Sequence, residues 1–280
     1  MPGSNSSGRV VVISGGTDGM GRAIALARLE RGDRVIVVGS NPDKGSRLLT
    51  EAAGIGAGDR AEFIRADLSS LADTRAAIDR ITRETDVVDA VCLFANRQAP
   101  RRIVTDEGME KTFALYYLSR YLFSHELAPQ LRRSANPVIV NVAGVGVTQG
   151  HIHWDDLALE RRYSTVAAQL QAGRANDLLG VAFAALPDNP IKYVLYHPGF
   201  TKSGDLSPLP APVRGLLRVA AAVAGRPVER AVAPIHGFID VPPAAPLSAI
   251  DRGKSLPLTL KSLDPADAKR LAEVTATLLK

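Results

Sequence analysis

Three glycines near the start of the chain have the spacing of a dinucleotide-binding turn. Residues 10–21 read VVVISGGTDGMG, an apolar run that breaks into glycines and continues as a helical pattern to Arg31. Gly15 can leave a strand with an unrestricted φ, while Gly19 and Gly21 let the backbone approach a pyrophosphate and let the helix pack on the strand. A helix that starts there directs free N–H groups and a partial positive charge at the phosphates. The turn therefore predicts a nicotinamide dinucleotide site, and an ordinary tight turn is the alternative.

Two histidines are the other group whose spacing could do chemistry. His151 and His153 follow an apolar run at residues 138–143, and paired imidazoles can bind a metal or titrate near neutrality. The sequence offers neither a cysteine nor a further histidine near them to complete a set of ligands. We therefore expect surface histidines beside Trp154 and no metal site.

The composition limits the class of protein. The chain has 280 residues, of which 46% are hydrophobic and 22% charged, and this suits one domain with a substantial core. The net charge of +5 is scattered, and aromatic residues make up only 5%, so the sequence does not predict a nucleic-acid partner. The single Cys92 has no partner for an internal disulfide, and the sequence shows neither a signal segment nor a long apolar span. We expect a cytoplasmic protein without a membrane partner.

Apolar runs typical of strands alternate with helical patterns along most of the chain. Several runs, such as residues 35–38, are continuously apolar, as expected for parallel strands covered by helices on both faces. This order predicts an α/β fold, a Rossmann-type doubly wound parallel sheet flanked by helices. The predicted strands are 10–14, 34–39, 61–65, 88–95, 138–143 and 192–197, and the predicted helices are 19–31, 44–53, 71–84, 106–131 and 164–185.

The two ends of the chain differ in character from this alternation. Residues 1–8 are rich in Ser and Gly and predict a disordered lead-in, with a single domain over 9–280. Residues 204–246 are rich in proline and predict a C-terminal lid or substrate-side insert, with helices at 213–223 and 228–237. A surface segment with no role in substrate binding is the alternative. A final strand at 256–260 and a helix at 265–279 would complete the fold.

Taken together, these motifs resemble the short-chain dehydrogenase/reductase family over nearly the whole chain. Residues 14–21 are similar to its Thr-Gly-x-x-x-Gly-x-Gly turn, and residues 93–96 to its Asn-Asn-Ala-Gly strand end, of which only Ala95 is kept. Residues 150–157 and 174–176 resemble the retinol-dehydrogenase-like branch. The resemblance implies the following cofactor-binding set: Gly15, Thr17, Asp18, Gly19, Met20, Gly21, Ser40, Asn41, Lys44, Asp67, Leu68, Ala95, Asn96, Pro198, Gly199 and Ser203.

The end of the second predicted strand bears on the choice of cofactor. Enzymes that use NAD usually carry an acid there, which binds the ribose hydroxyls and repels a 2′-phosphate. Here Ser40 and Asn41 follow the strand without a carboxylate, and Lys44 adds positive charge. Asp18 in the glycine turn argues the other way. On balance the sequence favours NADP(H) over NAD(H).

The family's catalytic positions are all substituted. The resemblance implies an Asn, a Ser and a Tyr–Lys pair spaced i,i+4 on one helix face, and these positions hold Tyr116, Gly144, Gln169 and Gly173. The catalytic residues are therefore unknown from the sequence. Tyr116, with Arg120 one turn further on, is a weak candidate for the proton donor, and an aromatic of the core or of a dimer face is the alternative. Tyr163 is less favoured because Ala167 follows it at i+4.

The loss of these groups does not exclude a redox reaction. A positioned general acid contributes about 10²–10⁴-fold to the rate, whereas the hydride comes from the cofactor. We expect an atypical NADP(H)-dependent ketoreductase that acts on a bulky hydrophobic or polyketide-like carbonyl with a non-standard proton donor. A catalytically silent protein that binds NADP(H) or a metabolite is the alternative, as is a non-redox cyclase or dehydratase. The resemblance also makes a homodimer possible, through the helices that hold Tyr116 and Gln169.

Overall fold

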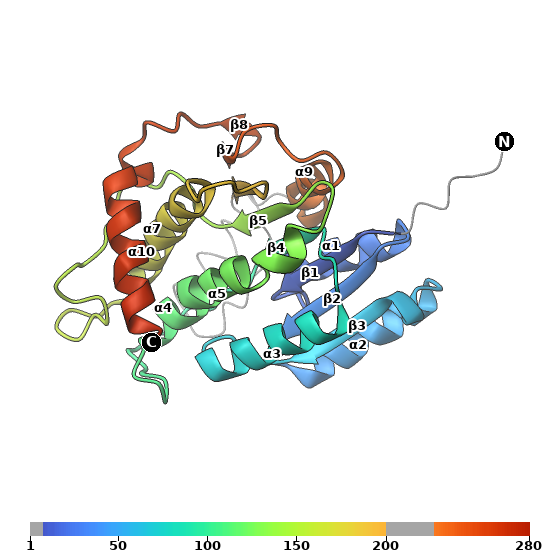
Figure 1. The fold of residues 1–280 in the computed structure, drawn as a ribbon. Helices are drawn as coiled ribbons and strands as arrows, with labels where there is room; N and C mark the ends of the chain where they lie inside the picture. The colour runs from blue at the N-terminus through green and yellow to red at the C-terminus, as the bar shows by residue number, and fades with distance from the viewer. Residues whose placement is uncertain (1–7, 200–226) are drawn as a thin grey trace.

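An eight-stranded sheet forms the centre of the protein (Figure 1). The computed structural model describes residues 8–199 and 227–280. The strand order is β3-β2-β1-β4-β5-β6-β7-β8, and every neighbouring pair is parallel except β7 and β8. The strands are β1 (Val10–Ser14), β2 (Arg34–Gly39), β3 (Ala61–Arg65), β4 (Ala90–Leu93), β5 (Val138–Val142), β6 (Lys192–His197), β7 (Leu247–Asp251) and β8 (Lys254–Ser255). The chain order reverses between β1 and β4, which is where ligands bind in such sheets.

Helices cover both faces of the sheet, so the strands are buried on both sides. One face carries α1 (Gly19–Glu30), α2 (Pro42–Gly54) and α9 (Val228–Asp240). The other carries α3 (Leu71–Glu84), α4 (Lys111–Phe113), α5 (Ser119–Glu126), α6 (Ala128–Leu131), α7 (Thr165–Ala184) and α10 (Pro265–Leu278). Alternate residues of a strand enter different cores: Val12 packs on the α7 side, and Val11 and Ile13 on the α1 side. The predicted Rossmann-type fold is confirmed.

Most predicted elements lie where the sequence places them, but the predicted strand at 256–260 is wrong. The last parallel strand is β7, and a tight turn joins it to β8. Pro257 interrupts the segment that follows and has no N–H to give to a ladder. The predicted helix at 106–131 begins at Lys111 and is divided into α4, the π-helical turn η2 (Ala114–Leu118), α5 and α6.

Parts of the sequence-based predictions lie outside the described residues. These are Ser203, the helix at 213–223, the lid from 204 to 226 and nearly all of the predicted disordered lead-in. The second helix predicted in the lid region is present and extends to Asp240 as α9. Among the helices that the structure describes, none is both long enough and apolar enough to cross a membrane.

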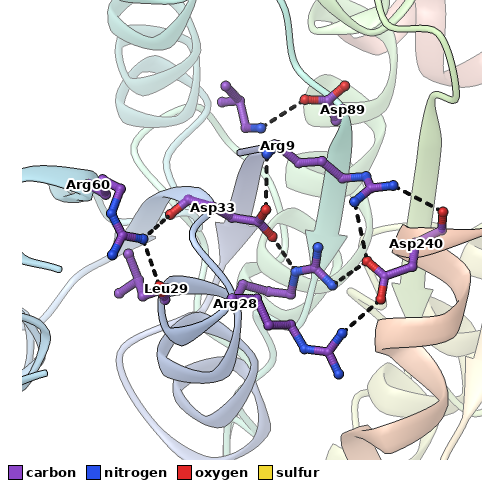
Figure 2. Close-up of polar contacts among 9 residues, drawn as sticks. Arg9, Arg28, Leu29, Asp33, Arg60, Asp89 and Asp240 are labelled. Atoms are coloured by element: carbon purple, nitrogen blue, oxygen red, sulfur yellow. Dashed lines mark hydrogen bonds and ion pairs between the residues drawn. The ribbon is translucent and has the colours of Figure 1, made fainter. Parts of the chain in front are cut away.

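A cluster of charges fixes α9 to the amino edge of the sheet (Figure 2). Asp240, the last residue of α9, accepts hydrogen bonds from Arg28 at 2.7 Å and Arg31 at 2.9 Å, and Arg9 contacts it as well. Arg28 is buried and also pairs with Asp33, which precedes β2. Breaking a buried pair leaves an uncompensated charge. This cluster therefore holds the element that follows residue 226, at the edge of the sheet opposite to the glycine turn.

Candidate active site

The glycine turn between β1 and α1 has a geometry that other residues would disrupt. Gly15 has a φ of +72°, and a Cβ built on it would lie 2.7 Å from the backbone nitrogen of Ala95. A Cβ on Gly21 would lie 2.3 Å from the carbonyl oxygen of Gly15. The turn therefore lies against the carboxyl end of β4, and the N-terminus of α1 faces the space above it. The residues present fit a pyrophosphate at this place.

Two charged side chains pair at the end of β2. Asp18 caps α1, since its Oδ1 accepts the N–H of Gly19 at 2.8 Å, and its Oδ2 accepts a hydrogen bond from Lys44. The bond from Lys44 lowers the pKa of Asp18 despite partial burial. Asn41 caps α2 by accepting the N–H of Lys44 at 2.9 Å, and Ser40 is exposed beside it. The structure thus brings together the residues predicted to hold the adenosine end, and Lys44 already has an acidic partner there.

The remaining predicted cofactor residues lie along the carboxyl edge of the sheet. After β3, Asp67 accepts the N–H of Ser69 at 2.9 Å and its hydroxyl at 2.7 Å, so the carboxylate also shapes its own loop, while Leu68 is buried. Pro198 and Gly199 follow β6, and Gly199 has a φ of +85°. These residues, after β3 and after β6, thus lie at the same edge of the sheet as the glycine turn, on either side of it.

A buried polar network holds the backbone beside the substrate region. Arg120 is fully buried and donates to the carbonyl oxygens of Val142 at 2.9 Å and Ala95 at 3.0 Å, and to the Asn141 side chain. Asn141 donates to Asn176 Oδ1 at 2.9 Å. Asn176 in turn donates to the carbonyl oxygen of Tyr116 at 2.7 Å. The network joins α5 to β5, η2, α7 and the segment after β4, although the buried Nε of Arg120 has no hydrogen-bond partner among the described residues.

Tyr116 occupies the centre of this region. It lies in the π-helical turn η2, a geometry that often occurs at functional sites. The Arg120 guanidinium stands 4.6 Å from the centre of its ring, and the ring packs against Ala143 and Ala172. Its hydroxyl oxygen accepts the N–H of Gly144. Burial raises the pKa of Tyr116 more than Arg120 lowers it, so the phenol keeps its proton and can donate a hydrogen bond.

Gln169 and Gly173, predicted to stand at the family's tyrosine and lysine positions, carry no ionisable group. Gln169 and Asn96 exchange two amide hydrogen bonds, from Asn96 Nδ2 to Gln169 Oε1 at 3.1 Å and from Gln169 Nε2 to Asn96 Oδ1 at 3.2 Å. A Cβ built on Gly173 would meet none of the described residues within 4 Å. The Tyr163 hydroxyl donates to the carbonyl oxygen of Ala99 at 2.8 Å, a bond that fixes a loop.

The predicted histidine pair lies in the loop between β5 and α7, and the N–H of His153 donates to Gln171 Oε1 of α7 at 2.9 Å. The rings of His151 and His153 are 4.2 Å apart and line an open hollow of about 420 Å³ together with Trp154 and Arg161. The described part of the chain contains no group of side chains that could hold a metal ion.

Two features of the site were missed by the sequence analysis. Asp177 is buried in α7, burial raises its pKa to about 7, and its Oδ2 accepts the N–H of Gly146 at 3.1 Å. The available signal was an acid directly before the apolar second half of that helix. The second feature is a contact of 2.8 Å between His197 Nδ1 and Asp251 Oδ1, at the ends of β6 and β7. These residues are 54 positions apart, and only the strand pairing brings them together.

Comparison with known proteins decides the family. The sequence model of the short chain dehydrogenases matches residues 9–156, more than half of the chain. The chain belongs to the short-chain dehydrogenase family. Membership implies that it binds a pyridine nucleotide, either NAD or NADP. The matched part ends before α7, the helix that holds Gln169 and Gly173.

Individual relatives agree with this membership. A Streptomyces protein named as a candidate daunorubicin C-13 ketoreductase is 32% identical over 69% of this chain and 66% of its own length. Mouse retinol dehydrogenase 13 is 29% identical over 59% of this chain and 50% of its own length. The chain thus spans about half to two thirds of the length of these curated relatives.

Solved structures share the fold at low sequence identity. A short chain dehydrogenase of Shigella flexneri, crystallised with NADP, superposes with a TM-score of 0.65 at 15% identity and covers 88% of this chain and 97% of its own. A Mycobacterium paratuberculosis protein gives a TM-score of 0.68 at 20% identity and covers 96% and 92%. The retinol-dehydrogenase-like branch predicted from the sequence is confirmed by the curated relatives.

Proposed function

We propose that this short-chain dehydrogenase is an atypical NADP(H)-dependent reductase of a hydrophobic, activated carbonyl compound, such as a polyketide-like ketone. The observation that carries the proposal is the glycine turn. Gly15 and Gly21 lie where a single additional carbon would collide with backbone atoms, so the turn keeps the close approach that a pyrophosphate needs. The substitutions are concentrated at the proton-transfer positions and leave the glycines of this turn unchanged.

The charges at the end of β2 support NADP(H). Ser40 is exposed where an NAD-dependent enzyme would carry an acid, and Lys44 lies beside it. Asp18 opposes this preference, because it already pairs with Lys44. We infer that a 2′-phosphate competes with Asp18 for Lys44 and accepts a hydrogen bond from Ser40.

The bound nucleotide supplies the hydride, and the protein's own groups place the carbonyl. The N-terminus of α1 holds the pyrophosphate. Tyr116 donates a hydrogen bond to the substrate oxygen from the place beside Gly144, where the family's serine would stand. Arg120 stabilises negative charge at that oxygen, since its guanidinium lies 4.6 Å from the ring.

The surroundings of the site favour an apolar substrate. Val147 and Leu258 are exposed large hydrophobic residues on the two segments that meet at Gly146, where Leu256 and Leu260 approach the backbone. An apolar rim of this kind can bind a hydrophobic ligand. This is the support for a bulky hydrophobic carbonyl rather than a small polar one.

One observation favours a second function, the binding of NADP(H) without catalysis. The amide pair between Gln169 and Asn96 closes the tyrosine position with groups that do not transfer protons at neutral pH. A nucleotide-binding protein without catalytic activity needs no proton-transfer group at this position, so such a pair would not impair it.

Turnover assays distinguish the two functions. Purified protein is incubated with NADPH and a panel of ketones and quinones, and loss of the reduced-nicotinamide absorbance is followed, with NADH in a parallel series. The reductase predicts consumption of NADPH with activated hydrophobic substrates. Binding of NADPH without consumption over the whole panel would refute the reductase and support the silent protein.

A further inference from the structure

We propose that His197, held by Asp251, is the proton donor that replaces the missing tyrosine–lysine pair. The proposal rests on the proposed reductase function and names the group that protonates its substrate. It concerns the histidine that directly precedes Pro198 and Gly199 of the predicted cofactor-binding set.

The strand pairing places His197 beside the empty serine position. Val142 of β5 is paired with Tyr196 of β6, and the N–H of Ala143 donates to the carbonyl oxygen of Tyr196 at 3.1 Å. His197 therefore lies next to Ala143, against which the Tyr116 ring packs. Gly144 follows directly and has no side chain to fill the space between the strand ends. His197 thus lies at the carboxyl edge of the sheet, between the end of β5 and Asp251 of β7, which its ring contacts.

The contacts of the imidazole leave one nitrogen for chemistry. Nδ1 lies 2.8 Å from Asp251 Oδ1, so Nδ1 carries a proton and donates it to the carboxylate. The second nitrogen, Nε2, has no hydrogen-bond partner among the described residues, and the side chain is 34% exposed. A histidine oriented by a carboxylate through one nitrogen and free at the other is the arrangement used for general acid–base catalysis.

The carboxylate is itself held in place. Arg252 donates to Asp251 through Nη2 at 2.9 Å and Nε at 3.1 Å. These hydrogen bonds from Arg252 and His197 lower the pKa of Asp251 although burial acts to raise it. Arg252 has a φ of +51° in the tight turn after β7, and its N–H donates to the carbonyl oxygen of His197 at 2.8 Å. A non-glycine residue with such a φ is strained. This strained residue contacts both His197, through its backbone N–H, and Asp251, through its side chain.

The step balances in atoms and charge. A bound reduced nicotinamide would supply the hydride for the carbonyl carbon, and the electron pair of the C=O π bond would move to oxygen. His197 Nε2–H protonates that oxygen, so the imidazolium becomes neutral imidazole and the product is an alcohol. Asp251 stabilises the imidazolium before the step, and solvent returns the proton through the exposed side of the ring.

The charged groups near the histidine set its pH dependence. Asp251 and Arg252 lie on β7 and its turn, Lys254 of β8 is paired with Asp251, and Tyr116 lies beyond Ala143. Because the protonated ring gives up the proton, reduction should slow as the pH rises.

Two variants test the proposal through activity and through a readout that needs no turnover. His197→Gln should lower kcat for ketone reduction by about 100-fold or more and leave the Kd of NADPH unchanged. The matched control, His151→Gln, removes an exposed histidine outside the site and should behave as wild type. In the protein without nucleotide, histidine NMR should show a protected Nδ1–H of His197 that is lost in Asp251→Asn, with the His151 signals unchanged.

The outcomes separate this proposal from the proposed function. If His197→Gln has the kcat of wild type and an unchanged pH profile, His197 is not the proton donor, and the proposed reductase function still stands. An unchanged His197 Nδ1–H signal in Asp251→Asn would also overturn the proposal, because the carboxylate would then not hold the ring. Wild type without any turnover but with bound NADPH would refute the reductase and the donor together.

Discussion

Substitution of Gly15 by alanine tests whether the glycine turn is the feature that binds the nucleotide. The added Cβ would lie 2.7 Å from the nitrogen and 2.8 Å from the Cα of Ala95, so the backbone of one strand end would have to move. Such overpacking costs about 1–3 kcal/mol. The φ of +72° adds about 1–3 kcal/mol for a residue that has a side chain. The sum is a loss of about 2–6 kcal/mol in the free energy of unfolding.

Gly56 supplies a matched control for the backbone strain. Its φ is +69°, nearly that of Gly15, but a Cβ there would meet none of the described residues within 4 Å. Gly56→Ala should therefore cost only the strain, about 1–3 kcal/mol, and should bind nucleotide as wild type does. Any difference between the two variants measures the close approach to Ala95.

The assay combines denaturant unfolding with titration of NADPH by fluorescence. We expect Gly15→Ala to be less stable than Gly56→Ala and to lose at least tenfold in affinity for NADPH, because the turn must move away from β4. Gly15→Ala and Gly56→Ala that match in stability, together with unchanged NADPH affinity in Gly15→Ala, would refute the reasoning.

Three further predictions concern the substrate side. Tyr116→Phe should lower kcat at least tenfold with the Kd of NADPH kept, and steady-state kinetics in which kcat does not change would remove its hydroxyl from the mechanism. The double variant Gln169→Tyr, Gly173→Lys should reduce unactivated ketones faster than wild type, because it rebuilds the i,i+4 pair, with open space around the Cβ at position 173; equal rates would contradict the view that the lack of this pair limits turnover. Asp177→Asn should be more stable than wild type at pH 8 but equal to it near pH 4 in urea unfolding. Burial raises the pKa of Asp177 from 3.8 to about 7, so ionisation destabilises the native state as the pH rises through this window, by up to about 4 kcal/mol, and parallel stability curves would contradict it.

Most strands and helices could be predicted from the sequence because each of them has a recognisable local pattern. Continuous apolar runs mark β1 and β2, the glycines mark the turn to α1, and Ser70 and Ser164 cap the helices that follow them. The prediction of a strand at 256–260 was wrong because its leucines form an apolar run typical of a strand. The last parallel strand, β7, is a half-buried segment in which apolar and polar residues alternate less clearly.

The candidate site was only partly predictable, for a physical reason. The cofactor residues lie close to one another in short turns, so local patterns identify them. The network from Arg120 through Asn141 to Asn176, and the contact of His197 with Asp251, join residues that are distant in the chain. Their partners follow from strand order and register, which no local pattern contains. The pairing of Gln169 with Asn96 is of the same kind.

The central claim is that the turn from β1 to α1 holds a pyridine nucleotide although the usual proton-transfer pair is absent. Calorimetric titration of the purified protein with NADPH and with NADH tests it most directly. The account predicts saturable binding of NADPH at one site, weaker binding of NADH, and loss of both in Gly15→Ala. The absence of a detectable complex with either nucleotide would contradict it.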